Sequence, residues 1–271
     1  METDALSVAS KTASTNENLR VVFLTQNDVF YLPEAFRYLL DKFPAHSKTV
    51  GAVVFSVSPF GKRESFVDKM LRTFRIFGAG FFFRYGWRYL IGKLFRQDVR
   101  DVLMEKQVPI LEIEGSINGD EALAKIRNLQ PDVLVSIAGN QIFKKQLLEI
   151  PTKGTLNLHT ALLPKYRGLM PTFWVLKNGE PITGVSVFFV DEGIDSGPIL
   201  VQKQVAIGNM TQAQLIAETK RLGMDAIVEA LDLIESDKYH LIPNPESEKT
   251  YFSFPTEQDV REFYALGKRF Y

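Results

Sequence analysis

Short apolar runs rich in β-branched residues alternate along this chain with segments of helical apolar spacing. The runs at 19–25 and 49–57 flank a segment, 32–43, in which apolar residues recur every three or four positions. Runs of this kind are typical of strands buried on both faces in a parallel sheet. The same alternation predicts further strands at 108–113, 132–138, 154–158, 183–190 and 198–207, and helices at 119–129, 172–177 and 211–236.

This alternation predicts the α/β class, with a Rossmann-like, mostly parallel and twisted sheet that carries helices on both faces. Residues 1–18 are polar and are expected to form a disordered tail. Residues 19–240 are expected to form one domain, and residues 241–271 an arm that is extended at first and ends in a short helix. Ligands of such folds bind in a crevice beyond the carboxyl ends of the strands, so the chemistry is expected at that edge of the sheet.

Composition removes several classes of site. The chain has no cysteine, which excludes disulfides, thiolate metal sites and cysteine nucleophiles, and fits an intracellular compartment. Lysine plus arginine equals aspartate plus glutamate at 32 each, so the whole molecule has no field that would attract nucleic acid or a membrane. The tail lacks the apolar segment of a secretory signal, and Arg84 and Arg88 interrupt the most apolar stretch, 77–94. We therefore expect a cytoplasmic protein with no membrane span and no metal.

Only three histidines, His46, His159 and His240, are available as a base at neutral pH. His46 and His240 lie in segments of ordinary loop character. His159 follows Asn157 by two positions at the end of an expected strand, so both side chains point to the same face and can converge on one reacting atom. Alone, such a pair is more typical of polar residues that cap a turn. The surrounding sequence favours chemistry instead.

Two further motifs follow this pair. Leu163-Pro164 and Arg167-Gly168 come directly downstream within LLPKYRG, and about thirty residues later Asp195 stands within DEGIDSGPIL. The set resembles the formyltetrahydrofolate-dependent formyltransferase superfamily, whose members include glycinamide ribonucleotide, methionyl-tRNA and sugar-amine formyltransferases. The resemblance covers about 19–236. Thr160 stands where many relatives have serine, a change that keeps the hydroxyl.

The resemblance implies a catalytic role for three residues. Asn157 would donate a hydrogen bond to the oxyanion that develops when an amine attacks the formyl carbon. His159 would accept the proton that the ammonium intermediate loses, or donate to the oxyanion while charged. Asp195 would favour the charged form of the histidine and order a water for proton transfer to the leaving folate nitrogen. An aspartate in IDSG is otherwise only a turn former.

The resemblance also implies 10-formyltetrahydrofolate as co-substrate and a place for its pterin. The ring would lie against the end of the strand that precedes Asn157 and against the loop 190–195. A plain strand-to-helix turn is the alternative for each side chain there, and no glycine-rich phosphate loop is present to indicate a nicotinamide or nucleoside-triphosphate cofactor. The cofactor-binding residues expected are Gly139, Gln141, Ile142, Phe143, Val190, Asp191 and Gly193.

The segment 61–100 is the most unusual part of the chain. It contains ten lysines and arginines against three acids, interleaved with aromatic residues. It fits an acceptor site that pairs arginines with phosphates and stacks a nucleobase, or an amphipathic surface that lies on lipid headgroups. It also fits a pair of core-packing helices whose cationic faces are solvated.

The acceptor expected is the amine of a small molecule, with a sugar-nucleotide amine favoured. About 35 residues follow the last long helix, whereas relatives that act on charged tRNA carry a large C-terminal domain. A methionyl-tRNA-type formyltransferase, a formyl-folate hydrolase and a non-catalytic folate-binding protein are the alternatives. Nucleic acid is not the favoured partner, and the aromatic residues at 251–271 are compatible with a homodimer.

Overall fold

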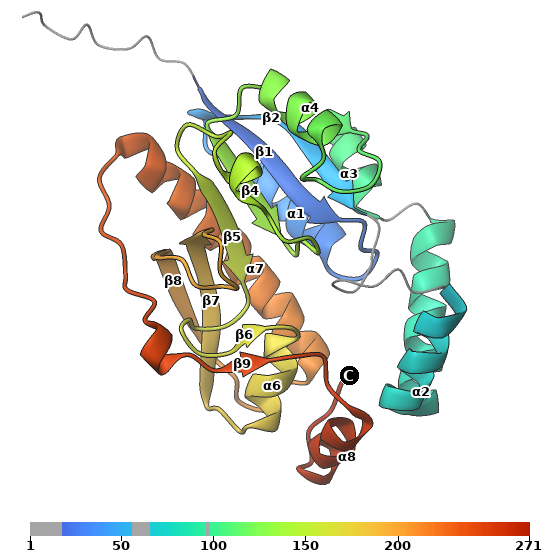
Figure 1. The fold of residues 1–271 in the computed structure, drawn as a ribbon. Coiled ribbons are helices and arrows are strands. Elements are labelled where there is room, and N and C mark those ends of the chain that lie inside the picture. The colour runs from blue at the N-terminus through green and yellow to red at the C-terminus, as the bar shows by residue number, and fades with distance from the viewer. Residues whose placement is uncertain (1–17, 56–65, 96–97) are drawn as a thin grey trace, which may run out of the picture.

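A seven-stranded sheet in the order β3-β2-β1-β4-β5-β7-β8 forms the centre of the molecule (Figure 1). The computed structural model describes residues 18–55, 66–95 and 98–271, so nearly all of the predicted tail, 1–18, lies outside the described residues. The first five strands of this order are parallel to their neighbours, while β7 is antiparallel to both β5 and β8. The strands are β1 (Leu19–Gln26), β2 (Ser47–Phe55), β3 (Ile110–Leu111), β4 (Val133–Ile137), β5 (Thr155–His159), β7 (Ile182–Phe189) and β8 (Ile199–Ala206).

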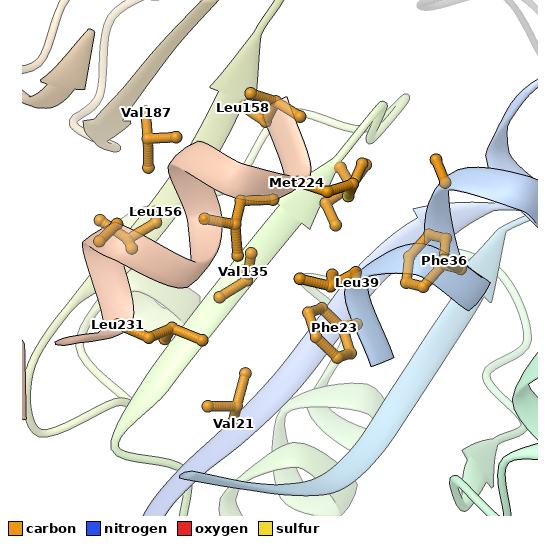
Figure 2. Packing of buried hydrophobic residues seen from close by; sticks show 14 of the residues in the cluster. Val21, Phe23, Phe36, Leu39, Val135, Leu156, Leu158, Val187, Met224 and Leu231 are labelled. Carbon is orange, nitrogen blue, oxygen red and sulfur yellow. The ribbon is translucent and has the colours of Figure 1, made fainter. Parts of the chain in front are cut away.

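Helices cover both faces of this sheet, which confirms the predicted fold class. On one face, α1 (Leu32–Asp41), α3 (Val99–Glu105) and α7 (Gln212–Ser236) bury the largest core cluster, part of which Figure 2 shows. On the other face lie α4 (Asp120–Asn128) and α5 (Lys145–Leu148). The alternation of side chains along the strands divides the two cores, since Val21 and Phe23 point to the first and Val22 and Leu24 to the second.

The long helix α7 fixes the position of β5. It begins with a capping box, in which Thr211 Oγ1 accepts from Gln214 N and Gln214 Oε1 accepts from Thr211 N. Gly223 faces Leu158 so closely that a Cβ there would stand 2.6 Å from Leu158 Cδ2. The absence of a side chain at this position therefore lets the helix lie directly on the strand that carries Asn157 and His159.

A third cluster joins the C-terminal segment to α6 (Pro171–Lys177) and α2 (Phe66–Leu94). The rings of Phe173 and Phe263 stack with centroids 4.9 Å apart, and Phe270 meets Phe77 of α2 edge to face at 5.5 Å. Aromatic contacts of this kind add to the burial of the rings themselves. The segment after α7 leads to α8 (Glu257–Ala265). The arm expected at 241–271, as a part separate from the domain 19–240, stays a prediction.

The shortest strands differ from the sequence-based expectation. The strand expected at 108–113 is only the two residues of β3, and the arm adds β9 (Tyr251–Phe252), which pairs in parallel with β6 (Arg167–Gly168). Two-residue strands are too short to show a hydrophobic period. No helix in the described parts of the chain is long and apolar enough to cross a membrane.

Candidate active site

Strand β5 presents Asn157 and His159 on the face opposite α7. Leu156 and Leu158, the alternate residues of the strand, point into the core beneath that helix (Figure 2). The strand lies between β4 and β7, where Asn157 is in register with Ser136 and His159 with Ser186. Asn157 is half-buried, and no described residue forms a hydrogen bond with its side chain, so its amide is free to meet a ligand.

The hydrogen bonds of His159 define the chemistry of its ring. The residue is 6% exposed, and its Nε2 lies 2.7 Å from the carbonyl oxygen of Tyr166. Because a carbonyl oxygen only accepts, Nε2 carries a hydrogen and donates it. The other ring nitrogen, Nδ1, lies 3.6 Å from Asp195 Oδ2. A proton gained or lost by this imidazole therefore resides on Nδ1, beside the Asp195 carboxylate.

Asp195 reaches His159 from the loop between β7 and β8. Its Oδ2 accepts a hydrogen bond of 2.8 Å from the backbone N–H of Gly168, and its side chain is 14% exposed. Its backbone is in the left-handed region, with φ of 49°, which is uncommon and costly for a residue other than glycine. The structure thus brings Asp195 and His159 together, and the Arg167-Gly168 turn helps to hold the carboxylate.

A polar network behind this loop connects it to the arm. The side chain Nδ2 of Asn244 donates to the carbonyl oxygens of Asp195 and Gly197 at 2.9 and 2.8 Å. The guanidinium of Arg167, 2% exposed, donates to Asn244 Oδ1 at 2.9 Å and forms an ion pair with Glu246. Hydrogen bonds from Lys249 and then Arg167 hold the pKa of Glu246 below its usual value. Sequence reasoning identified Arg167 but missed Asn244 and Glu246.

The loop that follows β5 is held from both sides. Ser186 Oγ donates to the carbonyl oxygen of Ala161 and accepts from the N–H of Leu163, at 2.8 and 3.1 Å. Tyr166 donates its hydroxyl hydrogen to Glu180 at 2.6 Å. Burial, then this hydrogen bond, raises the pKa of Tyr166 to about 12, so the hydroxyl stays a donor at neutral pH. The carbonyl group that orients His159 is therefore part of a fixed loop.

Replacing Gly168 with alanine is expected to lower the free energy of unfolding by about 3 kcal/mol or more. Gly168 has φ of 96°, and a Cβ there would stand 2.2 Å from the carbonyl oxygen of Phe252, so β9 must leave its partner. Gly179→Ala is the matched control, because Gly179 also has positive φ (70°) but faces open space, and only the backbone cost of about 1–2 kcal/mol applies. Urea unfolding measures both. Equal losses for the two variants would contradict the close contact with Phe252.

The expected donor residues lie at two neighbouring loops, and several of them already have partners within the chain. Gln141 Oε1 accepts from the N–H of Ile117, and Asp191 Oδ1 accepts from Gly193 N–H and Ser196 Oγ–H. A Cβ on Gly139 would stand 2.7 Å from Ser136 Oγ, so a larger residue there would displace the serine side chain of the preceding strand.

Ile142, 63% exposed, and buried Phe143 line a cavity of about 410 Å³, whereas Val190 packs beside the cores. The lining residues of this cavity are Ile142, Phe143, Lys144, Lys145, Gln146, Glu149 and Glu192. The cavity brings the loop after β4 together with the loop after β7. The assignment of the seven donor residues stays a prediction.

A cluster of aromatic and cationic side chains lies at the carboxyl end of β1. Arg88 of α2 lies over the rings of Phe30, Tyr31 and Tyr85, with its guanidinium carbon 5.2 to 5.6 Å from their centroids. Burial and a hydrogen bond with Tyr31 raise the pKa of Tyr85. Nearby, burial lowers the pKa of Lys220 to about 8, while Asp28 acts in the opposite direction. Within the described residues, no group of three histidine, aspartate or glutamate side chains lies close enough to hold a metal ion.

Comparison with known proteins was made at three levels. Residues 93–231, just over half of the chain, match the family described as formyl transferase. The methionyl-tRNA formyltransferase of Thermodesulfovibrio yellowstonii is 37% identical over 156 residues, which are 57% of this chain and 50% of that protein. The corresponding enzyme of Clostridioides difficile is 38% identical over 144 residues, 53% of this chain and 46% of that one. The chain spans about half the length of these curated relatives.

Solved structures share the fold at low sequence identity. The phosphoribosylglycinamide formyltransferase of Anaplasma phagocytophilum superposes with a TM-score of 0.60 at 16% identity, covering 88% of this chain and all of that one. The N-formyltransferase of Helicobacter canadensis, in complex with folinic acid and dTDP-3-aminofucose, superposes with a TM-score of 0.54 at 17% identity. That match covers 89% of this chain and 72% of the other.

Proposed function

The chain belongs to the formyl transferase family, and we propose that it transfers a formyl group from 10-formyltetrahydrofolate to a primary amine. The observation that carries this proposal is the site on β5. A free amide at Asn157 stands on the same strand face as His159, whose exchangeable nitrogen faces Asp195 at 3.6 Å. This combination supplies an oxyanion donor, a base and a carboxylate beside the base, which are the groups that acyl transfer to an amine requires.

In the proposed reaction, the amine nitrogen attacks the formyl carbon and a C–N bond forms. The electron pair of the formyl C=O bond moves to oxygen, and Asn157 stabilises that oxygen by donating from Nδ2. His159 Nδ1 accepts the proton of the new ammonium group, and the Asp195 carboxylate stabilises the imidazolium. The oxygen then re-forms the C=O bond as the bond to the folate nitrogen breaks, and the imidazolium returns its proton to that nitrogen, so the products are an N-formyl amine and tetrahydrofolate.

We place the donor between the loops after β4 and β7. Ile142 and Phe143 give the cavity of about 410 Å³ there its apolar part, and charged and polar side chains, Glu192 among them, line the rest. An apolar surface with polar groups beside it suits a flat heteroaromatic ring that also forms hydrogen bonds. In this proposal Gly139, Gln141, Val190, Asp191 and Gly193 shape the backbone that the pterin meets. The chemistry that 10-formyltetrahydrofolate supplies is the formyl group itself.

The acceptor that we propose is an amine on a sugar nucleotide. The support is the aromatic and cationic cluster around Arg88, Tyr31 and Tyr85, which offers rings to stack a base and a guanidinium to pair with phosphate. A neighbour of similar fold is complexed with dTDP-3-aminofucose. Methionyl-tRNA is the second candidate, because curated relatives of 37 and 38% identity are methionyl-tRNA formyltransferases. We also propose that the reaction takes place in the cytoplasm.

The test is spectroscopic measurement of tetrahydrofolate release from 10-formyltetrahydrofolate with nucleotide-linked amino sugars, simple amines and charged initiator tRNA. Release that depends on a sugar-nucleotide amine is the expected result. Release that depends only on the tRNA would make charged tRNA the acceptor in place of a sugar nucleotide. Release without any amine would indicate a hydrolase, and folate binding with no turnover on the whole panel would indicate a non-catalytic binding protein.

A further inference from the structure

Helix α2 stands beside the sheet (Figure 1), and the other described residues pack against it along one side. After the break at Gly78, where φ is 81° and ψ is 173°, its inner side is formed by residues spaced three or four apart. Phe81 meets Phe270 at 5.1 Å, and Tyr85 meets Phe30 at 5.5 Å. The inner residues are Phe81, Tyr85, Arg88 and Gly92.

The opposite side of the same helix is apolar and exposed. Each of its residues comes two positions after an inner residue, which is about 200° around an α-helix. We call this set the outer stripe: Phe83, Trp87, Leu90 and Leu94, which are 69%, 67%, 62% and 75% exposed. The part of α2 before Gly78 carries a set with the same spacing: Val67, Leu71 and Phe74, which are 61%, 59% and 46% exposed.

A row of four large apolar side chains at 3-4 spacing differs from the scattered apolar residues of an ordinary protein surface. Single exposed apolar residues need no explanation, but a continuous stripe on one helix face is typical of a face that meets another apolar phase. The inner side of α2 is already occupied, so the outer stripe has no role in the fold of the described residues. It is available to a partner.

The charges of α2 are all of one sign over most of its length. From Met70 to Leu94 the sequence has five lysines and arginines and no aspartate or glutamate. On the helix, Arg84 and Lys93 lie on either side of the outer stripe, each about 90° from it. Among the described residues no carboxylate pairs with Arg84, which lies over the ring of Tyr271, whereas Lys93 pairs with Asp98. The stripe is therefore bordered by the positive charge of Arg84 on one side and by the Lys93–Asp98 ion pair on the other.

We propose that the outer stripe of α2 docks this protein on an anionic lipid surface, with the helix lying in the plane of the headgroups. Aromatic and leucine side chains along one face with basic residues beside them have the chemistry of an interfacial helix. Trp87 is suited to the headgroup level, where its ring is buried and its N–H remains hydrated. The flanking cations meet the negative surface potential of anionic lipids.

A second copy of the chain is a poorer occupant on charge grounds. If two α2 helices met through their outer stripes, the Arg84 side chain of each would approach the other, and neither helix has an acid from Met70 onward to compensate that charge; Lys93 is already paired with Asp98. A bilayer surface with anionic headgroups supplies both the apolar phase and the opposite charge. The docking proposal does not depend on the reaction proposed above, because binding is measured without substrate.

The experiment is sedimentation of the full chain with vesicles of phosphatidylcholine alone and with vesicles that contain about 30% phosphatidylglycerol. The stripe variant is Phe83→Ser with Leu90→Ser, which keeps Trp87 as a fluorescent reporter. The control variant is Met104→Ser with Ile182→Ser, which removes two apolar side chains that are also exposed (60% and 48%) from α3 and β7. Thermal unfolding checks that both variants keep the stability of the parent, as substitutions at exposed positions should.

The parent and the control are expected to bind the anionic vesicles about tenfold or more tightly than the neutral ones, with a blue shift of tryptophan emission. The stripe variant is expected to lose at least about tenfold in binding, and added salt should weaken the binding of all three. Equal binding by the parent and the stripe variant would overturn the proposal. So would dimerisation that depends on the stripe without vesicle binding, which would assign the face to a second copy.

Discussion

Replacing His159 with glutamine is expected to lower kcat by about two to four orders of magnitude. The glutamine amide still donates a hydrogen bond, so it can satisfy the carbonyl oxygen of Tyr166 that now accepts from Nε2. It has no atom that replaces Nδ1 as a base beside Asp195. The loss is therefore chemical, and KM for the folate donor should change far less than kcat. Steady-state release of tetrahydrofolate measures both constants.

Two companion variants sharpen this prediction. Asp195→Asn keeps the shape of the side chain and one oxygen for the Gly168 N–H, but removes the charge that stabilises the imidazolium. If His159 and Asp195 act as one unit, the double variant should be about as slow as His159→Gln alone, because effects within such a unit do not add. Additive losses would show that the two side chains act separately. A wild-type kcat in His159→Gln would remove His159 from the mechanism.

The sequence predicts most of the sheet because its strands and helices are long enough to show a period. β1 and α7 are found within about a residue of their expected bounds. The same reasoning fails for β6 and β9, which have two residues each and pair across 84 positions. It also gives no information on the break at Gly78, since glycine in an apolar stretch is compatible with a continuous helix.

The residues of the site likewise include some that the sequence predicts and some that it does not. Asn157, His159 and Asp195 lie in short motifs, so their types and spacing indicate a reaction before the structure is known. Asn244 gives no such signal. The carbonyl groups of Asp195 and Gly197, to which its side chain donates, lie 49 and 47 positions away, and these contacts depend on the path of the arm. The sequence alone is compatible with three roles for the segment 61–100, which contains α2. Its inner side packs as a core helix does, and its outer stripe has no counterpart in the fold.

Replacing Asn244 with aspartate is expected to lower kcat by about 10- to 100-fold although the residue lies behind the reacting groups. The variant keeps Oδ1 as an acceptor for Arg167 but exchanges the Nδ2 donor for an oxygen that faces the carbonyls of Asp195 and Gly197. The new carboxylate then faces two carbonyl oxygens with no hydrogen to donate to them, so the loop that carries Asp195 must move. Displacement of a catalytic group by about 1 Å is sufficient for a loss of this size.

Lys249→Met is the matched control for this network. Lys249 pairs with the exposed Glu246 from the solvent side, and loss of such a surface pair should change kcat and stability little. Arg167→Met should resemble Asn244→Asp, because the buried guanidinium holds Asn244 through two hydrogen bonds. Urea unfolding measured beside steady-state kinetics separates positioning from folding. A displaced Asp195 lowers the kcat of a protein that is still fully folded, whereas a merely less stable protein keeps the parent kcat under folding conditions. Parent kcat in Asn244→Asp, with lowered unfolding free energy, would show that the arm supports only the fold.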